Sequence, residues 1–238
     1  MPETKIKQQV YSYKIELDIR RDAWNWYITC NNHNISHGVD FSQKIPIEII
    51  SKIKDKSEGE ANEFIIPFLE QKYIKDKEEI NQFTSQVKND YAHKFSLACQ
   101  KIVELTGKPL YRNDFTTFIT TAPRAPYRYI SGYTWLPIGW FDPIKTFMHE
   151  LLHFQFIHYW RMIPKSEVNK LSNEQFEYLK ESLTVILDDD LRPIIQMPDK
   201  GYEKHKDLRQ ELHAFWKENK DFDKLVIFGL GILSKYTN

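Results

Sequence analysis

This chain of 238 residues lacks most of the features that would point directly to a partner. Lysine plus arginine and aspartate plus glutamate both number 33, so the formal net charge is zero. Nucleic acids and anionic membranes favour proteins with an excess of basic residues, and we expect neither as a main partner. No apolar run reaches the length of a membrane span, and no repeat or low-complexity linker divides the chain.

Cysteine is also scarce, which excludes a disulfide framework. Cys30 and Cys99 are the two cysteines of the chain, and we expect both to be reduced thiols. The first residues are charged and polar, without the apolar segment that a secretory signal contains. We therefore expect a cytoplasmic protein.

Apolar residues that alternate with polar ones near the start of the chain predict a β-hairpin. The alternation covers residues 11–19 and 24–30, and the polar residues 20–22 separate the two runs. An apolar residue at every second position is typical of a half-buried strand. A short polar break between two such runs is typical of a hairpin.

From about residue 46 to residue 106 the apolar residues recur at the spacing of amphipathic helices. Pro67 is expected to kink or delimit one of these helices, and Gly107 to end the last of them. Residues 116–121 and 127–140 are rich in aromatic and β-branched side chains, which predicts short strands. We therefore expect an α+β fold with a small mixed or antiparallel sheet.

Two later helices have clear start signals. Asp142 and Pro143 are typical of an N-cap and a first helical residue, and they predict a helix that runs to about Met162. The segment Ser172–Gln175 has the spacing of a capping box. It predicts a second helix that ends near Asp190.

The first of these helices carries the strongest chemical signal in the chain, the motif H-E-x-x-H formed by His149, Glu150 and His153. Positions i and i+4 share a face of a helix, so both imidazoles can reach one metal ion. The glutamate between them can hold and deprotonate a water molecule on that ion. The surrounding residues are apolar, and buried polar groups need partners. A pair of core histidines bonded to the backbone or to carboxylates is the alternative interpretation.

A catalytic zinc site needs a third protein ligand and an open position for water. Position 159 is Tyr, which excludes the pattern H-E-x-x-H-x-x-G-x-x-H, and the helical period turns His158 away from the motif. The following helix offers Glu174, Glu177 and Glu181 on one face. Glu181 opens the most apolar part of that helix, where a carboxylate needs a cation or a hydrogen-bond donor, and we predict it as the third ligand.

The acidic residues 188–190 close the second helix, and one of them is a candidate to orient a ligand histidine from outside the coordination sphere. A further donor is expected to stabilise the oxyanion of a hydrolytic reaction. The candidates for this role are Tyr202 and His205, followed by His213 and Tyr133.

Residues 115–190 resemble the gluzincin branch of the zincin metallopeptidases, in which a helix with H-E-x-x-H precedes a helix with a ligand glutamate. The resemblance implies that His149, His153 and Glu181 bind Zn²⁺ and that Glu150 is the general base. It also implies a zincin-like fold with an edge strand, here residues 129–135 or 116–121, that pairs with extended substrate. Val185 stands where gluzincins often carry an aspartate.

The sequence therefore predicts a zinc metallopeptidase that hydrolyses a peptide or protein substrate with a zinc-activated water. Residues 1–109 would form an N-terminal β-hairpin and helical region, and residues 110–238 a zincin-like catalytic region, unless both belong to one continuous domain. Two alternatives stay open. One is a non-proteolytic binding or regulatory protein on a zincin scaffold, and the other is a metal-free domain in which the histidines only pack.

Overall fold

A four-stranded mixed sheet forms the centre of the protein, which the computed structural model describes over residues 10–31, 38–189 and 191–237. In spatial order its strands are β1 (Ser12–Glu16), β2 (Asp114–Thr120), β4 (Tyr133–Pro137) and β3 (Tyr127–Arg128). β2 pairs in parallel with β1 and with β4, whereas β3 is antiparallel to β4. This mixed sheet, together with the many helices, confirms the predicted α+β class.

The sheet corrects the prediction of an edge strand for the substrate. Residues 116–121 overlap β2, which has neighbours on both sides, and residues 129–135 lead into β4, which also lies inside the sheet. The two edge strands are β1 and β3, and of these β3 reaches the cavity described below, at Tyr127. An edge strand is expected at either end of such an open sheet, but the sequence alone did not identify which segment it is.

The predicted N-terminal hairpin is wrong. The first alternating run forms β1, but the second lies in helix α1 (Ile19–Asn31). Ala23, Trp26 and Cys30 are buried on one face of α1, because spacings of three and four residues bring them together on a helix. β1 pairs instead with β2, about a hundred residues further along the chain.

Three helices connect α1 to β2, namely α2 (Ile47–Ile53), α3 (Glu58–Lys75) and α4 (Lys77–Thr106). Ser57 and Glu60 form a capping box at the start of α3. This helix continues through Pro67, so of the two expected effects Pro67 does not delimit the helix, and the kink stays a prediction. α4 ends at Gly107 as predicted, in the left-handed conformation (φ 64°) that glycine adopts without strain.

The last four helices are α5 (Pro143–Phe156), α6 (Asn173–Leu183), α7 (Lys206–Asn219) and α8 (Phe222–Ile232). The predicted caps are confirmed at both expected helices. The Asp142 carboxylate accepts a hydrogen bond from the Lys145 amide at the start of α5, and Ser172 and Gln175 form the capping box of α6. A π-helical turn then extends α5 to residue 161.

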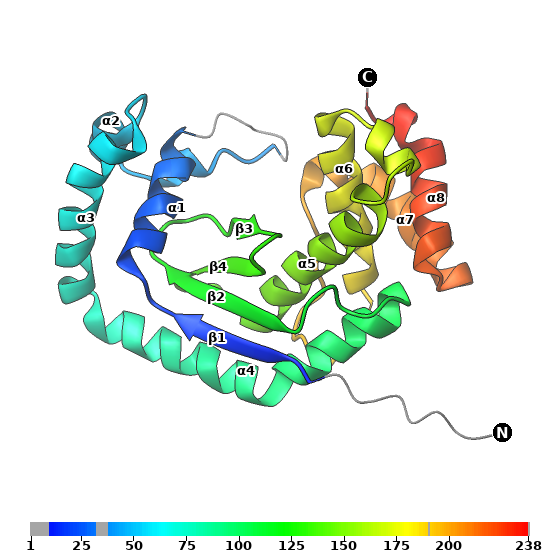
Figure 1. The fold of residues 1–238 in the computed structure, drawn as a ribbon, viewed down its shortest axis with the longest axis horizontal. Coiled ribbons are helices and arrows are strands. Elements are labelled where there is room, and N and C mark those ends of the chain that lie inside the picture. Colours follow the sequence, from blue (N-terminus) through cyan, green and yellow to red (C-terminus); the bar gives the residue numbers. More distant parts are fainter. Residues whose placement is uncertain (1–9, 32–37, 190, 238) are drawn as a thin grey trace.

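The buried apolar side chains form two cores, at the two ends of the arrangement of helices and sheet that Figure 1 shows. The larger lies where α4, α5 and the sheet meet, with the rings of Phe95 and Phe147 5.1 Å apart, and it continues among α6, α7 and α8. The smaller lies among α1, α2 and α3 at the other end of the sheet. Cys99 is buried in the larger core and Cys30 in the smaller, and both are free thiols. No helix of the described ranges is long and apolar enough to cross a bilayer.

Candidate metal centre

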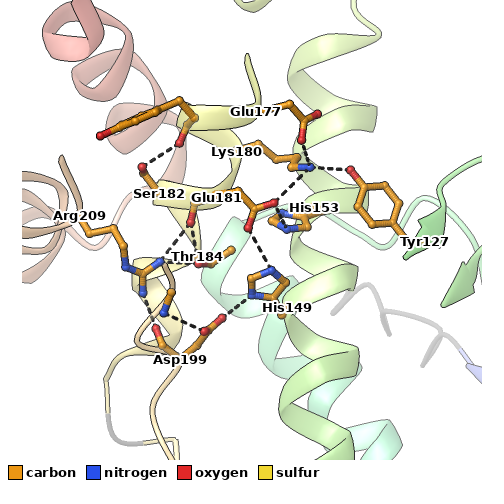
Figure 2. Close-up of polar contacts among 12 residues, drawn as sticks. Tyr127, His149, His153, Glu177, Lys180, Glu181, Ser182, Thr184, Asp199 and Arg209 are labelled. Atoms are coloured by element: carbon orange, nitrogen blue, oxygen red, sulfur yellow. Dashed lines mark hydrogen bonds and ion pairs between the residues drawn. The ribbon is translucent and has the colours of Figure 1, made fainter. Parts of the chain in front are cut away.

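Helices α5 and α6 bring the three predicted metal ligands together. His149 and His153 project from one face of α5, one turn apart, and Glu181 projects towards both from α6 (Figure 2). Nε2 of His149 lies 3.3 Å from Oε2 of Glu181, and Nε2 of His153 lies 3.1 Å from Oε1. One carboxylate therefore faces both imidazoles of the motif, as expected for the third ligand.

The spacing of these atoms fits a zinc ion. One ligand atom from each of the three residues can be chosen so that all lie within 4.8 Å of one another. Ligand atoms about 2.1 Å from a tetrahedral zinc ion lie about 3.4 Å apart. The two distances between imidazole nitrogens and carboxylate oxygens are close to that value, so small side-chain movements would complete the coordination.

The protonation states of two of these groups also suit a ligand. Burial lowers the pKa of His153 to about 3, which keeps this imidazole neutral. Burial would raise the pKa of Glu181, but His153, Lys180 and the hydrogen bonds from the imidazoles hold it well below its usual range. A neutral imidazole and an ionised carboxylate are the forms that bind metal ions.

Asp199 orients His149 from outside the candidate coordination sphere. Its carboxylate contacts Nδ1 of His149 and leaves Nε2 directed at Glu181. Burial opposes the charge on both side chains, but each stabilises the other. The pKa of His149 is therefore raised well above its usual range and that of Asp199 is lowered to about 2. Contacts of this kind fix the orientation of ligand histidines in metal sites.

Lys180 connects the centre to the sheet. Its ammonium group donates to the Tyr127 hydroxyl of β3 at 2.8 Å and pairs with Glu177 at 2.7 Å and with Glu181 at 3.3 Å. Burial disfavours the charge, but Tyr127 and the two carboxylates outweigh burial and raise the pKa of Lys180. This arrangement fixes one oxygen of Glu181 while the other faces His149.

Arg209 of α7 holds α6 and the Asp199 loop in register. The guanidinium donates to the Glu181 carbonyl at 3.1 Å and to Oγ1 of Thr184 at 2.5 Å, and it also contacts the Asp199 carbonyl. A 2.9 Å ion pair joins it to Asp188. Gly201, just beyond Asp199, has φ +64°, and a Cβ atom there would lie 2.7 Å from this guanidinium.

These contacts correct the expectation for residues 188–190. Asp188 pairs with Arg209, and Asp189 with His213 and Lys220, so neither orients a ligand histidine. Asp190 lies outside the described residues. Asp199 is the carboxylate that orients His149 instead. It lies in a segment without helical or strand periodicity, so local sequence patterns contain no signal for it.

A cavity of about 700 Å³ opens beside the centre. Its wall includes all four motif and ligand residues, a face of α1, the start of β3 and the segment 199–202. Glu150 lies in this wall, and its buried Oε2 has no hydrogen-bond partner among the described residues. Burial raises the pKa of Glu150 to about 7, and the nearby charge of His149 opposes this rise.

Of the four residues predicted as candidates to stabilise an oxyanion, one lines the cavity and three lie elsewhere. Tyr202 lines the cavity, and burial, followed by the nearby acids Glu181 and Glu150, raises the pKa of its hydroxyl. His205 is fully buried outside the cavity wall, with its ring 4.6 Å from that of Tyr178. Tyr133 lies in β4 over Arg21, and His213 contacts Asp189, so neither reaches the centre.

Sequence reasoning missed the partners of the predicted ligands. Lys180 is adjacent to Glu181 in the buried half of α6, and a buried lysine next to a buried glutamate was a usable signal. Arg124 lines the cavity from the segment between β2 and β3, and Tyr127 lines it from the start of β3. Their role depends on how the sheet lies against α5, which no local pattern contains.

Comparisons with known proteins do not assign this site. No family model matches the chain, and no curated protein or solved structure matches it either. The resemblance to gluzincins therefore consists of the motif and Glu181.

Proposed function

We propose that this protein is a zinc-dependent metallopeptidase with a zincin-like fold, in which Glu150 is the general base. One observation carries the proposal. The Glu181 carboxylate lies 3.1 and 3.3 Å from the two imidazoles of the motif, beside a cavity into which Glu150 presents an unbonded oxygen.

The donor set supports zinc as the metal. Two imidazole nitrogens and one carboxylate oxygen are ligands that catalytic zinc sites use, with a further position open to the cavity. Nε2 of His149 and Nε2 of His153 both face the buried Glu181 carboxylate, so two imidazole nitrogens and an anionic oxygen already converge where a cation would bind. When bound, zinc would polarise a carbonyl group and make a water molecule more acidic.

Glu150 would move the proton in this reaction. Its unbonded oxygen can accept a proton from the attacking water and deliver it to the leaving amine. Asp199 and Lys180 would keep the His149 ring and the Glu181 carboxylate in place during this transfer. Tyr202, in the same wall, is the nearest of the predicted donors to a developing oxyanion.

The cavity supports a short peptide segment as the substrate. Its volume of about 700 Å³ lies within the range of about 300–1,000 Å³ that is typical of ligand pockets. The edge strand β3 reaches this cavity at Tyr127. An exposed strand edge can pair with an extended peptide through backbone hydrogen bonds, which would place the scissile bond beside α5.

The proposal is tested by zinc content together with turnover. We expect the purified protein, reconstituted with zinc and freed of excess metal, to retain about one equivalent and to cleave members of a peptide library. Glu150→Gln should keep the zinc and lower turnover by about 10²–10⁴-fold, as expected for loss of a general base. Glu174→Gln, an exposed change in the first turn of α6, is the matched control and should leave both unchanged.

Three results would overturn this function. Less than about a tenth of an equivalent of zinc after reconstitution would exclude the metal site. Full activity in Glu150→Gln would exclude the assigned base. A wild-type protein that holds zinc but cleaves no member of the library would favour the binding or regulatory alternative.

A further inference from the structure

An arginine in the cavity wall forms no ion pair with any carboxylate of the described residues. Arg124 follows β2 and lines the cavity with Glu150 and Tyr202, and its side chain is only partly exposed. Within the described ranges, no carboxylate lies within ion-pair distance of its guanidinium. The other cations in the wall are Lys180, which two glutamates neutralise, and Lys145, which is also without an ion pair among the described residues.

The main chain at Arg124 is held firmly. Its carbonyl accepts a 2.8 Å hydrogen bond from the amide of Asn25, a fully buried residue of α1. The same amide donates to Oγ1 of Thr120 at the end of β2. Pro123 and Pro126 flank the arginine and restrict the backbone on both sides. The main chain that carries this cation therefore does not need to become ordered when a ligand binds.

Burial without a counter-ion is unfavourable for this side chain. Desolvation lowers the pKa of Arg124, although Tyr202 and Glu150 partly oppose that effect, and a guanidinium nevertheless stays charged. A carboxylate that enters the cavity would remove this cost, because carboxylate and guanidinium form paired, charge-assisted hydrogen bonds. Lysine presents one point charge and cannot reproduce the paired geometry.

We propose that Arg124 binds a carboxylate group of the peptide substrate and thereby selects anionic peptides for the centre. The proposal rests on the proposed peptidase function, because it assigns a substrate class to the same cavity. Arg124 stands on the sheet side of this cavity and His149 and His153 stand on α5. The substrate carboxylate is therefore held beside the bond to be cleaved. This carboxylate is either the C-terminal one or that of an acidic side chain.

Three peptide pools distinguish these two sources. All peptides are acetylated hexapeptides of random sequence. The first pool lacks acidic residues and has a free C-terminal carboxylate, the second is the same pool with an amidated end, and the third is amidated but contains aspartate and glutamate. Cleavage is followed by mass spectrometry with the zinc-loaded protein, and binding of fluorescent versions by anisotropy. We expect one carboxylate-bearing pool to exceed the neutral pool by about tenfold or more in kcat/KM.

Arg124→Ala should remove this preference. We expect KM for the preferred pool to rise by about 10–100-fold with little change in kcat, because the lost interaction contributes to substrate binding and does not involve the reacting atoms. Arg124→Lys should recover part of the loss, because charge returns without the paired geometry. Lys145→Ala removes another unpaired cavity cation and is the matched control, for which we expect the preference to persist. Circular dichroism and zinc content should be unchanged in all three variants.

Each of the other outcomes overturns the role of Arg124, the peptidase function, or both. A wild-type protein that cleaves the neutral pool as well as the others overturns the role of Arg124 and leaves the peptidase function standing. An equal fall in kcat on all three pools in Arg124→Ala would also overturn this role, because it would identify Arg124 as an oxyanion donor. A loss of preference in Lys145→Ala as large as that in Arg124→Ala would overturn it as well. Binding that needs both the carboxylate and Arg124, without any cleavage, supports the role and overturns the peptidase function. Neither binding nor cleavage of any pool overturns both.

Discussion

The two apolar cores of this protein differ in the polar groups that they enclose. The larger core contains the α5–α6 centre, where His153, Lys180, Glu181 and Arg209 are all buried and bonded to one another or to neighbouring carboxylates and carbonyls. The smaller core lies among α1, α2 and α3, and the buried polar residues beside it on α1 are Asp22, Asn25 and Thr29. There a single fully buried carboxylate, Asp22, joins the two regions.

The bonds of Asp22 show what such a carboxylate does. It accepts hydrogen bonds from Oγ1 of Thr120 at 2.5 Å, from the amide of Thr121 at 3.0 Å and its hydroxyl at 2.8 Å, and from the hydroxyl of Tyr73 at 3.0 Å. These partners lie at the end of β2 and in α3 (Figure 1). Buried polar groups therefore orient the candidate metal ligands in the larger core, and in the smaller core they attach a wall of the cavity to the sheet. Changes in the two regions should affect different properties.

The largest effect is expected for a direct ligand. Glu181→Gln should weaken zinc binding by more than about 100-fold, above the range typical of groups outside the coordination sphere, because the amide cannot supply an anionic ligand. Zinc affinity is measured by competition with a chromophoric chelator.

Glu177→Gln is the matched control for that change. Glu177 lies one turn earlier on α6, lines the same cavity and bonds the same lysine, but it does not face the imidazoles. Its zinc affinity should stay within about threefold of wild type. Equal losses in the two variants would show that helix charge, not ligation, determines the affinity.

A smaller loss of zinc affinity is expected at Asp199. Asp199→Ala removes the acceptor for His149 Nδ1 and should weaken zinc binding by about 10–100-fold, the range typical of partners that orient ligand histidines. Asp189→Ala, which removes a carboxylate bonded to His213 and Lys220, should leave the affinity unchanged. An unchanged zinc affinity in Asp199→Ala would show that the contact of Asp199 with His149 does not contribute to zinc binding.

The two regions also differ in how much of their structure could be predicted from the sequence. α5 and α6 were predicted with their caps, and the sequence also identified the three residues that face one another across them, because capping, helical periodicity and the i, i+4 motif are all local. α1 was mistaken for a strand because Trp26 and Cys30 fit both a two-residue and a four-residue repeat. Asp199 reaches His149 through a loop whose course is set by Arg209 of a later helix, and no short-range pattern contains such a contact.

The third expected effect is on stability and belongs to the smaller core. Asp22→Ala leaves the buried hydroxyls of Thr120 and Tyr73 without their acceptor and should lower the free energy of unfolding by about 2 kcal/mol. Urea denaturation measures this change. Asp22→Asn keeps one acceptor oxygen and should lose less. Zinc affinity of the folded protein should be unchanged in both variants, and a parallel loss of zinc would show that the two regions are not independent.

The smallest effect compares the two cores through their cysteines. Cys30 lies in the smaller core and Cys99 in the larger. Burial raises the pKa of Cys30 to about 11 and also raises that of Cys99, so the closed state contains little reactive thiolate.

Alkylation of these thiols then proceeds through local opening, and a region with fewer buried contacts opens more readily. We expect iodoacetamide to label Cys30 about tenfold faster than Cys99 in native protein, as measured by peptide mass spectrometry. Asp22→Ala should accelerate labelling of Cys30 but not of Cys99, because the bonds that it removes attach α1 to the sheet and to α3 and do not reach the larger core. Equal acceleration at both thiols would mean that the cores open together and that the cavity wall cannot move without the centre.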